Sequence, residues 1–236
     1  RLRGEGVIPD GVRFQVCLPT PMASGFMYVS PNALEDYLPV YERALIGALD
    51  AILAAVPHDE LSLQWDICQE VLVFEDYFPS RPDDYRQQIF DELARLGGQV
   101  PADVELGYHL CYGTPKDEHL VMPTDTAILV EIANGIASGL DRRLDFIHLP
   151  VPKDRIDNAY YAPLAQLTLP DNTDLYLGLV HHDDHDGDVA RIRAAHEVVS
   201  TFGIASECGW GRTDPERVPG LIKSHRMAAE SVPVDT

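Results

Sequence analysis

The sequence predicts an α/β fold of the (β/α) barrel type, in a single domain over residues 1–236. Short apolar or alternating segments, typical of strands, take turns with segments of helical periodicity, which indicates a parallel sheet. Polar, chemically able residues also follow the ends of five strands: Asp66, His109 with Cys111, His148, His181 and Cys208. The carboxyl ends of all barrel strands surround one mouth, whereas an open doubly wound sheet gathers ligands mainly at one crevice, so a barrel fits better. The sequence contains no GxGxxG or GxxxxGK[ST] loop that would favour a nucleotide-binding open sheet.

The first strand and the first long helix carry clear signals. Residues 12–18 alternate apolar and polar side chains with period two, which predicts a strand, and the proline-rich residues 19–21 end it. Residues 41–56 have helical periodicity, with four apolar side chains on one face: Leu45, Leu49, Ile52 and Leu53. Pro39 is expected to break or kink the turn that precedes this helix, because proline lacks the backbone N–H.

The remaining elements follow the same alternation. Further strands are predicted at five apolar or alternating runs: residues 61–67, 104–110, 144–148, 175–180 and 202–206. Helical patterns separate or follow them: residues 83–96, 125–140, 188–201 and 218–230. Gly97 and Gly98 end the first of these helices, and residues 231–236 are expected to fray.

The composition excludes several classes of partner. The chain has 18 Lys and Arg against 38 Asp and Glu, a formal net charge of −20. Nucleic acids and anionic membranes bind clusters of cations, so neither partner is expected. No stretch reaches roughly 18 consecutive apolar residues, so no membrane span is predicted. The four cysteines are too sparse for a disulfide framework, so a reducing cytoplasm is expected, and a homodimer is left open.

One group of residues has the spacing of a metal site. His109 and Cys111 lie two residues apart at a strand end, so both side chains can face the same way. With the distant Cys208 they form a nitrogen and sulfur ligand set, which suits Zn²⁺ and leaves a fourth position open for catalysis. From spacing alone, an inert buried Cys111 thiol with His109 capping the strand is an equally good interpretation. Cys17 and Cys68 are expected to be packing residues.

Four short motifs, in this order, resemble those of the cobalamin-independent methionine synthase family. They are Leu63-Gln64-Trp65-Asp66, Tyr108-His109-Leu110-Cys111-Tyr112, Leu179-Val180-His181-His182 and Ser206-Glu207-Cys208-Gly209. The resemblance covers roughly residues 14–212 and implies a (β/α)8 barrel. It also implies that the second and fourth of these motifs bind zinc.

The resemblance also implies roles for residues outside the metal set. His181 matches a histidine that donates a proton, with His182 as the fallback. Asp66 matches the aspartate that holds the amino-acid thiol, although it could simply cap the following turn. Arg212 either holds a substrate carboxylate or stabilises its loop, and Trp210 follows Cys208 closely enough to line the pocket.

Three departures from the family pattern matter. The family has a glutamate zinc ligand where this chain has His148, which could replace it or touch substrate; Glu131 is nearer to the family spacing but falls in a predicted helix. Residues 150–155 have no recognised counterpart, so one substrate pocket is expected to differ. Only six strands are predicted, and the first resembles the third of the barrel, so two βα units are expected to be missing at the N-terminus.

The leading functional hypothesis is a zinc-dependent methyl or alkyl transferase acting on a small-molecule thiol. Zinc deprotonates a bound thiol at neutral pH, and the thiolate can then attack an alkyl carbon. The family implies methyl-folate as the donor, but its polyglutamate tail favours a basic mouth and this chain is acidic, so an aryl ether or a sulfonium stays open. The alternatives are a metal-independent lyase or decarboxylase on the related porphyrinogen-decarboxylase-like barrel, and a non-catalytic binding protein.

Overall fold

A computed structural model of the chain describes residues 1–113 and 119–231. Within these residues, six parallel strands form one sheet in chain order, β1-β2-β3-β4-β5-β6. The strands are β1 (Phe14–Pro19), β2 (Leu61–Ile67), β3 (Glu105–Leu110), β4 (Phe146–Pro150), β5 (Asp174–Val180) and β6 (Gly203–Ser206). The parallel α/β fold is therefore confirmed, and each strand lies within two residues of its predicted bounds at either end.

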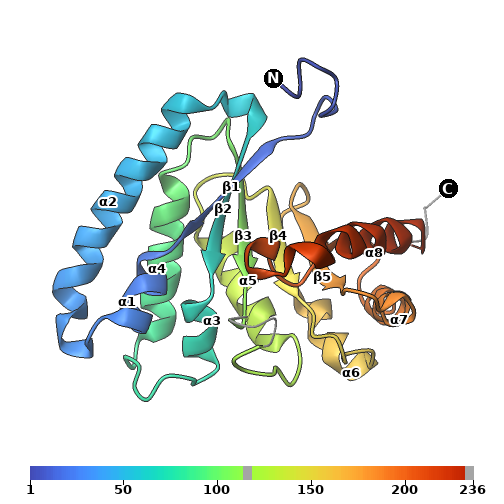
Figure 1. Cartoon of the computed structure of the whole chain (residues 1–236). Helices are drawn as coiled ribbons and strands as arrows, with labels where there is room; N and C mark the ends of the chain where they lie inside the picture. The colour runs from blue at the N-terminus through green and yellow to red at the C-terminus, as the bar shows by residue number, and fades with distance from the viewer. Residues whose placement is uncertain (114–118, 232–236) are drawn as a thin grey trace.

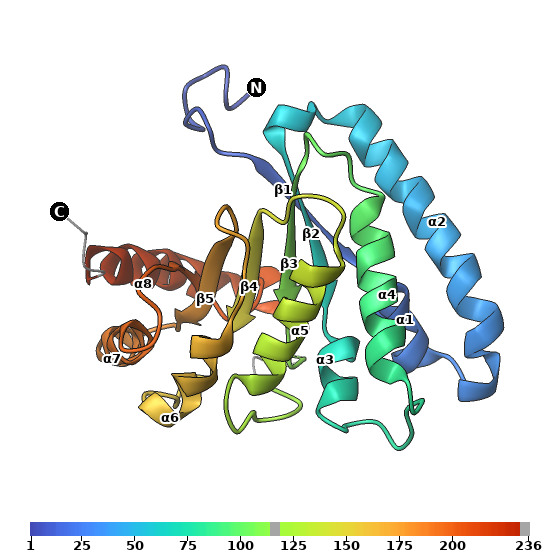
Figure 2. The same ribbon diagram turned by 180° about the vertical axis from the view of Figure 1, so that it is seen from behind.

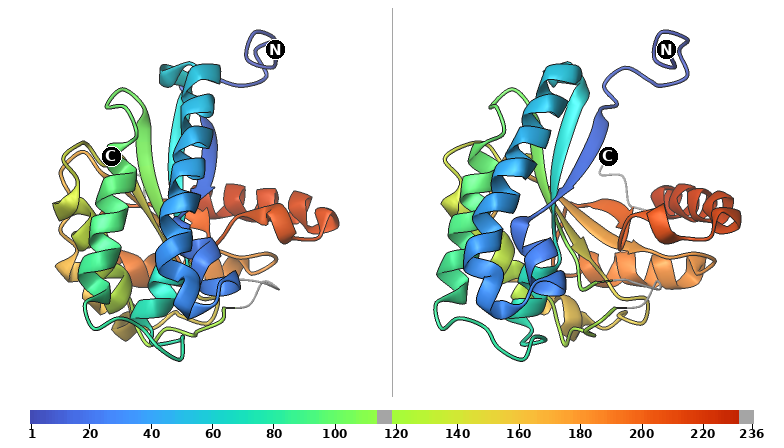
Figure 3. Two further views of the ribbon diagram at one scale, coloured as in Figure 1. Left: turned by 90° about the vertical axis from the view of Figure 1, so that its left-hand side faces the viewer. Right: turned by 60° about the vertical axis from the view of Figure 1, so that its left-hand side comes forward.

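The helices connect successive strands and cover the sheet. They are α1 (Pro21–Tyr28), α2 (Leu34–Ala55), α3 (Gln69–Phe74), α4 (Tyr85–Gly98), α5 (Ala127–Gly139), α6 (Asn158–Tyr161), α7 (His185–His196) and α8 (Val218–Ser231). Figure 1 and the reverse view in Figure 2 show α4 and α5 on one side of the sheet and α8 on the other. The side views in Figure 3 show the same arrangement, and α8 contacts β5, β6 and α7. We call the side that faces α8 the open face.

Two helices differ from their predicted form. Helix α2 begins at Leu34 and runs through Pro39 without a break, so the break expected there is wrong. Pro39 and Glu35, whose carbonyl loses its helical partner, are both exposed, so water can replace the missing hydrogen bond. Helix α7 begins three residues earlier than predicted, at His185, and ends at His196. The apolar face predicted for α2 is confirmed, since Leu45 and Leu49 of that helix are buried in the core.

Two glycines let aromatic rings lie across the open face of the sheet. Gly107 pairs with Phe146 in the β3–β4 register, and Gly203 pairs with Tyr176 in the β5–β6 register. A Cβ atom added at either glycine would collide with the ring of its partner. Each ring therefore occupies the space that the missing side chain leaves, which ties these glycines to their neighbours by packing.

Two carboxyl groups are buried in the helical layer. Glu70 on α3 is fully buried and accepts a hydrogen bond of 2.5 Å from the Thr20 hydroxyl. Burial raises the pKa of Glu70 to about 7 despite that hydrogen bond. Burial, and next the charge of Glu70, raise the pKa of Glu92 on α4 to about 8. Both groups are costly in their charged form, which makes the stability of this layer dependent on pH.

Strands β1 and β6 are the two edges of the sheet in the described part of the chain. The (β/α)8 barrel and the two absent βα units stay predictions, because six strands in sequential order neither close a barrel nor exclude one. Among the residues described, no helix is both long and apolar enough to cross a membrane. Residues 232–236, part of the segment predicted to fray, lie outside the described residues.

Candidate metal centre and adjoining cavities

The three predicted metal ligands come together at the carboxyl ends of β3 and β6. His109 is the last residue but one of β3, and Cys111 comes directly after that strand. Cys208 lies two residues after the end of β6. One ligand atom from each of the three residues lies within 4.8 Å of the others, and the two Sγ atoms are 4.0 Å apart. These three residues, His109, Cys111 and Cys208, thus form one cluster, which we call the HCC cluster. Its two cysteines are 97 positions apart in the sequence.

Local backbone contacts hold the Cys111 thiol in place. The Cys111 amide donates to the carbonyl of Ile67 on β2 at 3.0 Å, so the β2–β3 pairing continues one residue past the strand. The Gly113 amide then donates to the Cys111 sulfur at 3.3 Å. Gly113 has φ = +72°, a conformation that favours glycine, and this lets the chain turn back toward the sulfur. An amide directed at sulfur also stabilises a thiolate.

The donor set fits a soft cation. His109 is 5% exposed, and both of its ring nitrogens are buried without a hydrogen-bond partner among the described residues. The hydrogen bond with Cys208 lowers the pKa of Cys111, but the Cys68 thiol and burial outweigh it and raise that pKa to about 12. Contact with Cys111, followed by burial, raises the pKa of Cys208 to about 12. Unpartnered imidazole nitrogen beside two thiols that need a cation to ionise is the chemistry of a Zn²⁺ site.

The other two cysteines are closer to this cluster than expected. Cys68 is half-buried and lies near enough to Cys111 to affect its pKa. Cys17 is exposed on β1 and accepts weak hydrogen bonds from the side-chain amides of Gln15 at 3.5 Å and Gln64 at 3.4 Å. The expectation that Cys17 is a packing residue is therefore wrong, whereas for Cys68 it stays a prediction. Strand ends from the same sheet converge, and the spacing along the chain conceals that convergence.

The two candidates for a fourth ligand lie in different surroundings. His148 pairs with His109 in the β3–β4 register, and their rings stack with centroids 4.5 Å apart. Its Nε2 is buried and has no partner in the part of the chain that the structure describes, and burial, with the neighbouring His109, lowers the pKa of His148 well below its usual value. Glu131 lies on α5, where its carboxylate forms a 2.6 Å ion pair with Arg86 of α4 at the surface. The structure thus directs Glu131 away from the HCC cluster and leaves His148 beside it.

Two cavities meet at the turn that carries Cys208. The first, of about 540 Å³, lies at the carboxyl ends of β4 to β6, and the ionisable side chains in its wall include His119, Lys153, Asp154, His181, His182, Glu207, Cys208 and Arg217. The second, of about 430 Å³, lies on the open face, where its wall includes Gln15, Cys17, Gln64, His109 and His148. Four residues line both cavities: Ser206, Cys208, Gly209 and Trp210. The HCC cluster therefore has a cavity on each side.

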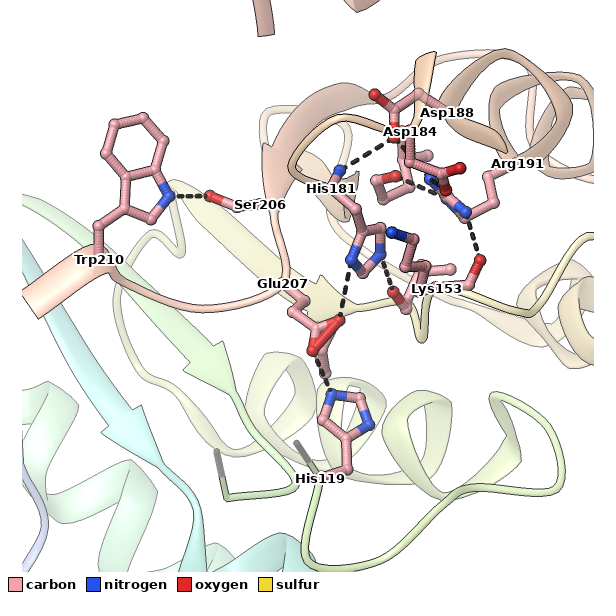
Figure 4. A network of polar contacts seen from close by, with 12 residues as sticks. His119, Lys153, His181, Asp184, Asp188, Arg191, Ser206, Glu207 and Trp210 are labelled. Carbon is pink, nitrogen blue, oxygen red and sulfur yellow. Dashed lines mark hydrogen bonds and ion pairs between the residues drawn. The ribbon is translucent and has the colours of Figure 1, made fainter. Parts of the chain in front are cut away.

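His181 takes part in a polar network in the first cavity (Figure 4). It follows β5, and its Nε2 lies 3.0 Å from the carbonyl of Val151. Its Nδ1 lies 3.5 Å from Oε2 of Glu207, whose Oε1 is 2.8 Å from Nε2 of His119. Burial lowers the pKa of His181, and the charge of Glu207 opposes that shift. Sequence reasoning missed Glu207 and His119; for Glu207 the signal was its place directly before Cys208.

Of the other predicted substrate residues, His182 and Trp210 line a cavity, whereas Asp66 and Arg212 are not among the lining residues. Asp66 accepts a 2.7 Å hydrogen bond from Gln64, and burial raises the pKa of Asp66. His182 lines the first cavity, with Nδ1 3.5 Å from Asp183. Trp210 lines both cavities, and its indole donates to the Ser206 hydroxyl at 2.7 Å. Arg212 is exposed in the short turn Trp210–Arg212.

Arg212 is not among the residues that line either cavity; Lys153 and Arg217, which sequence reasoning missed, line the first one. Lys153 lies in the segment of residues 150–155 that departs from the family pattern. The different pocket expected from that segment therefore includes a cationic side chain.

Comparison with known proteins places this fold in a class. No protein-family model matches the sequence, and no curated protein sequence is similar enough to match. Solved structures do match, and the fold is that of vitamin-B12-independent methionine synthase-like proteins, which confirms the resemblance carried by the four motifs.

Two of these structures are specific neighbours. One, from Listeria monocytogenes, is named "Putative Vitamin-B12 Independent Methionine Synthase"; it has a TM-score of 0.62 and 20% identity, and the match covers 98% of this chain and 67% of that one. The other is a B12-independent methionine synthase from Shewanella sp. W3-18-1 in complex with selenomethionine, with a TM-score of 0.60, 15% identity, and 92% of this chain and 61% of that one covered. The chain thus spans about two thirds or less of these proteins, and at such identities the likeness shows the fold.

Proposed function

We propose that the protein is a zinc-dependent methyltransferase that activates a small-molecule thiol acceptor. The observation that carries the proposal is the HCC cluster, in which a buried, unpartnered imidazole lies beside two thiols 4.0 Å apart. His109, Cys111 and Cys208 would hold the Zn²⁺, which leaves a fourth position for His148 or for the sulfur of the acceptor. The likeness of the fold to methionine synthase-like structures supports the same reaction class.

Each part of the chain has a task in this reaction. Bound Zn²⁺ supplies one kind of chemistry: it stabilises the acceptor thiolate at neutral pH, so that the sulfur is nucleophilic. His181 donates a proton to the leaving group of the methyl donor from the wall of the first cavity. Glu207 faces His181 and stabilises its protonated form. Asp66, half-buried beside Gln64, pairs with a cationic group of the acceptor.

The two cavities support a reaction between two substrates. A group transfer brings donor and acceptor to the same centre, and Cys208 lines both cavities. We assign the acceptor to the second cavity, beside Gln64, and the methyl donor to the first, which holds His181. The donor is methyl-folate or a smaller methylated compound such as an aryl ether or a sulfonium.

The proposal includes the rest of the barrel and the compartment. Two further βα units between β6 and β1 would complete a (β/α)8 barrel, and the sequential order of the six strands supports this. The four cysteines are free, and a thiol-based metal centre needs a reducing compartment, which supports a cytoplasmic location.

Metal analysis together with an activity assay tests the proposal. Protein purified with zinc should hold about one Zn²⁺ per chain, and mass spectrometry should detect methyl transfer from methyl-folate, an aryl methyl ether or a methyl sulfonium to a panel of small thiols. Cys208→Ser should lose both zinc and activity, whereas Cys17→Ser, on the exposed strand β1, should keep the zinc. Full zinc retention in Cys208→Ser would overturn the ligand assignment. Methyl transfer that survives complete metal removal would overturn the zinc-dependent reaction, and lyase or decarboxylase activity of the metal-free protein would favour that alternative instead.

A further inference from the structure

We propose that the buried pair Asp188–Arg191 of α7 is a positioning unit that fixes which ring nitrogen of His181 exchanges its proton in the first cavity. Both side chains are fully buried, and Nη2 of Arg191 lies 2.5 Å from Oδ1 of Asp188. The proposal rests on the proposed function only in giving His181 its proton-donating role.

The pair holds the backbone at the end of β5. Oδ1 of Asp188 accepts a 2.9 Å hydrogen bond from the backbone amide of His181 itself. Arg191 donates from Nε to the carbonyl of Leu179, two residues earlier, at 2.7 Å. Two side chains of α7 therefore hold the backbone at the end of β5, on either side of Val180. Helix α7 begins only four residues after His181. Hydrogen bonds to charged groups are stronger than neutral ones, so this anchoring is firm.

The same guanidinium also holds the loop that orients the imidazole. Nη1 of Arg191 donates to the carbonyl of Lys153 in the loop after β4 (Figure 4). Two residues earlier in that loop, the carbonyl of Val151 lies 3.0 Å from Nε2 of His181. Arg191 thus connects the strand that carries His181 with the loop that carries its hydrogen-bond partner.

This arrangement selects one tautomer of His181. A carbonyl oxygen can only accept a hydrogen bond, so Nε2 of His181 must carry a hydrogen to bind Val151. Nδ1 is then the nitrogen that gains and loses the proton, and it faces Oε2 of Glu207 at 3.5 Å. If the loop of Val151 moved relative to β5, either nitrogen could carry the hydrogen.

The cost of burying this pair argues for a specific purpose. A buried ion pair is expensive to desolvate and is often matched in stability by apolar residues of similar size. Here the contacts of the pair converge on the segment of His181 and on the loop that binds its ring, with Asp184 as a second carboxylate 2.9 Å from Nη2 of Arg191. Only positioning uses all of these contacts.

Nuclear magnetic resonance of the histidine side chains tests the proposal without any assay of activity. In ¹⁵N-labelled protein, the signal that disappears in His181→Gln is that of His181, and it should show the Nε2–H tautomer alone. Asp188→Asn, and the apolar double variant Asp188→Leu/Arg191→Met, which removes the buried charges together, should show a mixture of tautomers. Asp186→Asn and Arg193→Lys, exposed on the same helix, are the matched controls and should keep the single tautomer. A single Nε2–H tautomer in a folded Asp188→Leu/Arg191→Met protein would overturn the proposal.

Kinetics provide an independent readout. Asp188→Asn should lower kcat at least tenfold with KM changed by less than about twofold, because orientation of the acid is needed only in the transition state. In a His181→Gln background the same substitution should have no further effect, since it acts through His181. If Asp188→Asn lowered kcat further in the His181→Gln background, so that the two losses of kcat were additive, the positioning role would be contradicted. If no methyl transfer occurs in the wild-type protein, the proposed function fails, while the tautomer measurement still decides this proposal.

Discussion

His109 and His148 lie directly opposite each other on β3 and β4, with their imidazole rings stacked at a centroid distance of 4.5 Å. The stacking fixes the plane of His109, whose two ring nitrogens have no hydrogen-bond partner. A metal-binding imidazole usually depends on a neighbour that holds its ring in place. In the proposed zinc site, His148 would have this role whether or not its own Nε2 is a ligand.

We therefore expect His148→Ala to weaken zinc binding about ten- to hundredfold. His109→Ala should lose stoichiometric zinc, because it removes one of the ligands. Competition with a chromogenic chelator measures both affinities. His58→Ala is the control, since His58 forms its ion pair with Asp103 elsewhere on the surface. Unchanged zinc affinity in His148→Ala would show that the stacked ring has no part in the metal site.

His181→Gln should lower kcat by roughly 10²- to 10⁴-fold while zinc content stays at the wild-type level. The reason is that His181 lies in the wall of the first cavity and is not a member of the HCC cluster. His182→Gln distinguishes the fallback assignment, because its effect on kcat should be much smaller. If His182→Gln instead lowers kcat more than His181→Gln does, His182 is the proton donor. Zinc loss in His181→Gln would instead assign a structural role to His181.

Protein stability should depend on the buried carboxyl of Glu70 in a pH-dependent way. Its pKa is about 7 in the folded protein against an ordinary value of 4.5, so the unfolded chain releases this proton at lower pH. Stability is then lost as pH rises from about 4.5 through 7, by about 3 kcal/mol for this group. Glu70→Gln stays neutral at every pH and should gain stability relative to wild type over that range.

Urea unfolding at about pH 5 and about pH 8 measures this difference. Glu92→Gln should also gain stability relative to wild type as the pH rises. This gain should extend about one pH unit higher than that of Glu70→Gln, because the pKa of Glu92 is about 8. An advantage of Glu70→Gln that is equal at both pH values would show that the wild-type carboxyl is not protonated in the folded state.

Gly107→Ala should destabilise the protein by about 1–3 kcal/mol, because its Cβ collides with the ring of Phe146. Phe146→Leu in the same chain should recover much of the loss, since the smaller side chain vacates the space over the glycine. A double-mutant cycle by urea unfolding measures the coupling. Simple additivity of the two changes would show that the ring does not lie across Gly107.

The strands were predictable because their signals are local. Alternation with period two identifies residues 12–18 and 61–67 as strands, and the structure has β1 and β2 there. Pro39 was misjudged because local propensity ignores exposure: a helix tolerates a missing hydrogen bond where water can reach the free carbonyl. The start of α7 was also misjudged: the helix begins at His185, three residues before the predicted start at Asp188.

The candidate site was predictable only where its residues are close in sequence or carry a motif. His109 and Cys111 give a pattern that one strand end explains, and Cys208 was predicted because it too follows a predicted strand. Cys68 and His119 have no such pattern, since their contacts with Cys111 and Glu207 arise from the sheet order. Arg191 was missed for a similar reason: four of its partners are backbone or carboxylate groups on three separate segments.

Glu207 and Cys208 are consecutive residues, yet Glu207 contacts His181 and His119 while Cys208 belongs to the HCC cluster. Their Cα atoms are about 3.8 Å apart and joined by one planar peptide, so a backbone shift at Cys208 also moves the backbone of Glu207. In the proposed reaction, a backbone change at Cys208 would therefore reach the carboxylate that faces His181. We expect substitutions at residues 206–209 to affect both the HCC cluster and the surroundings of His181.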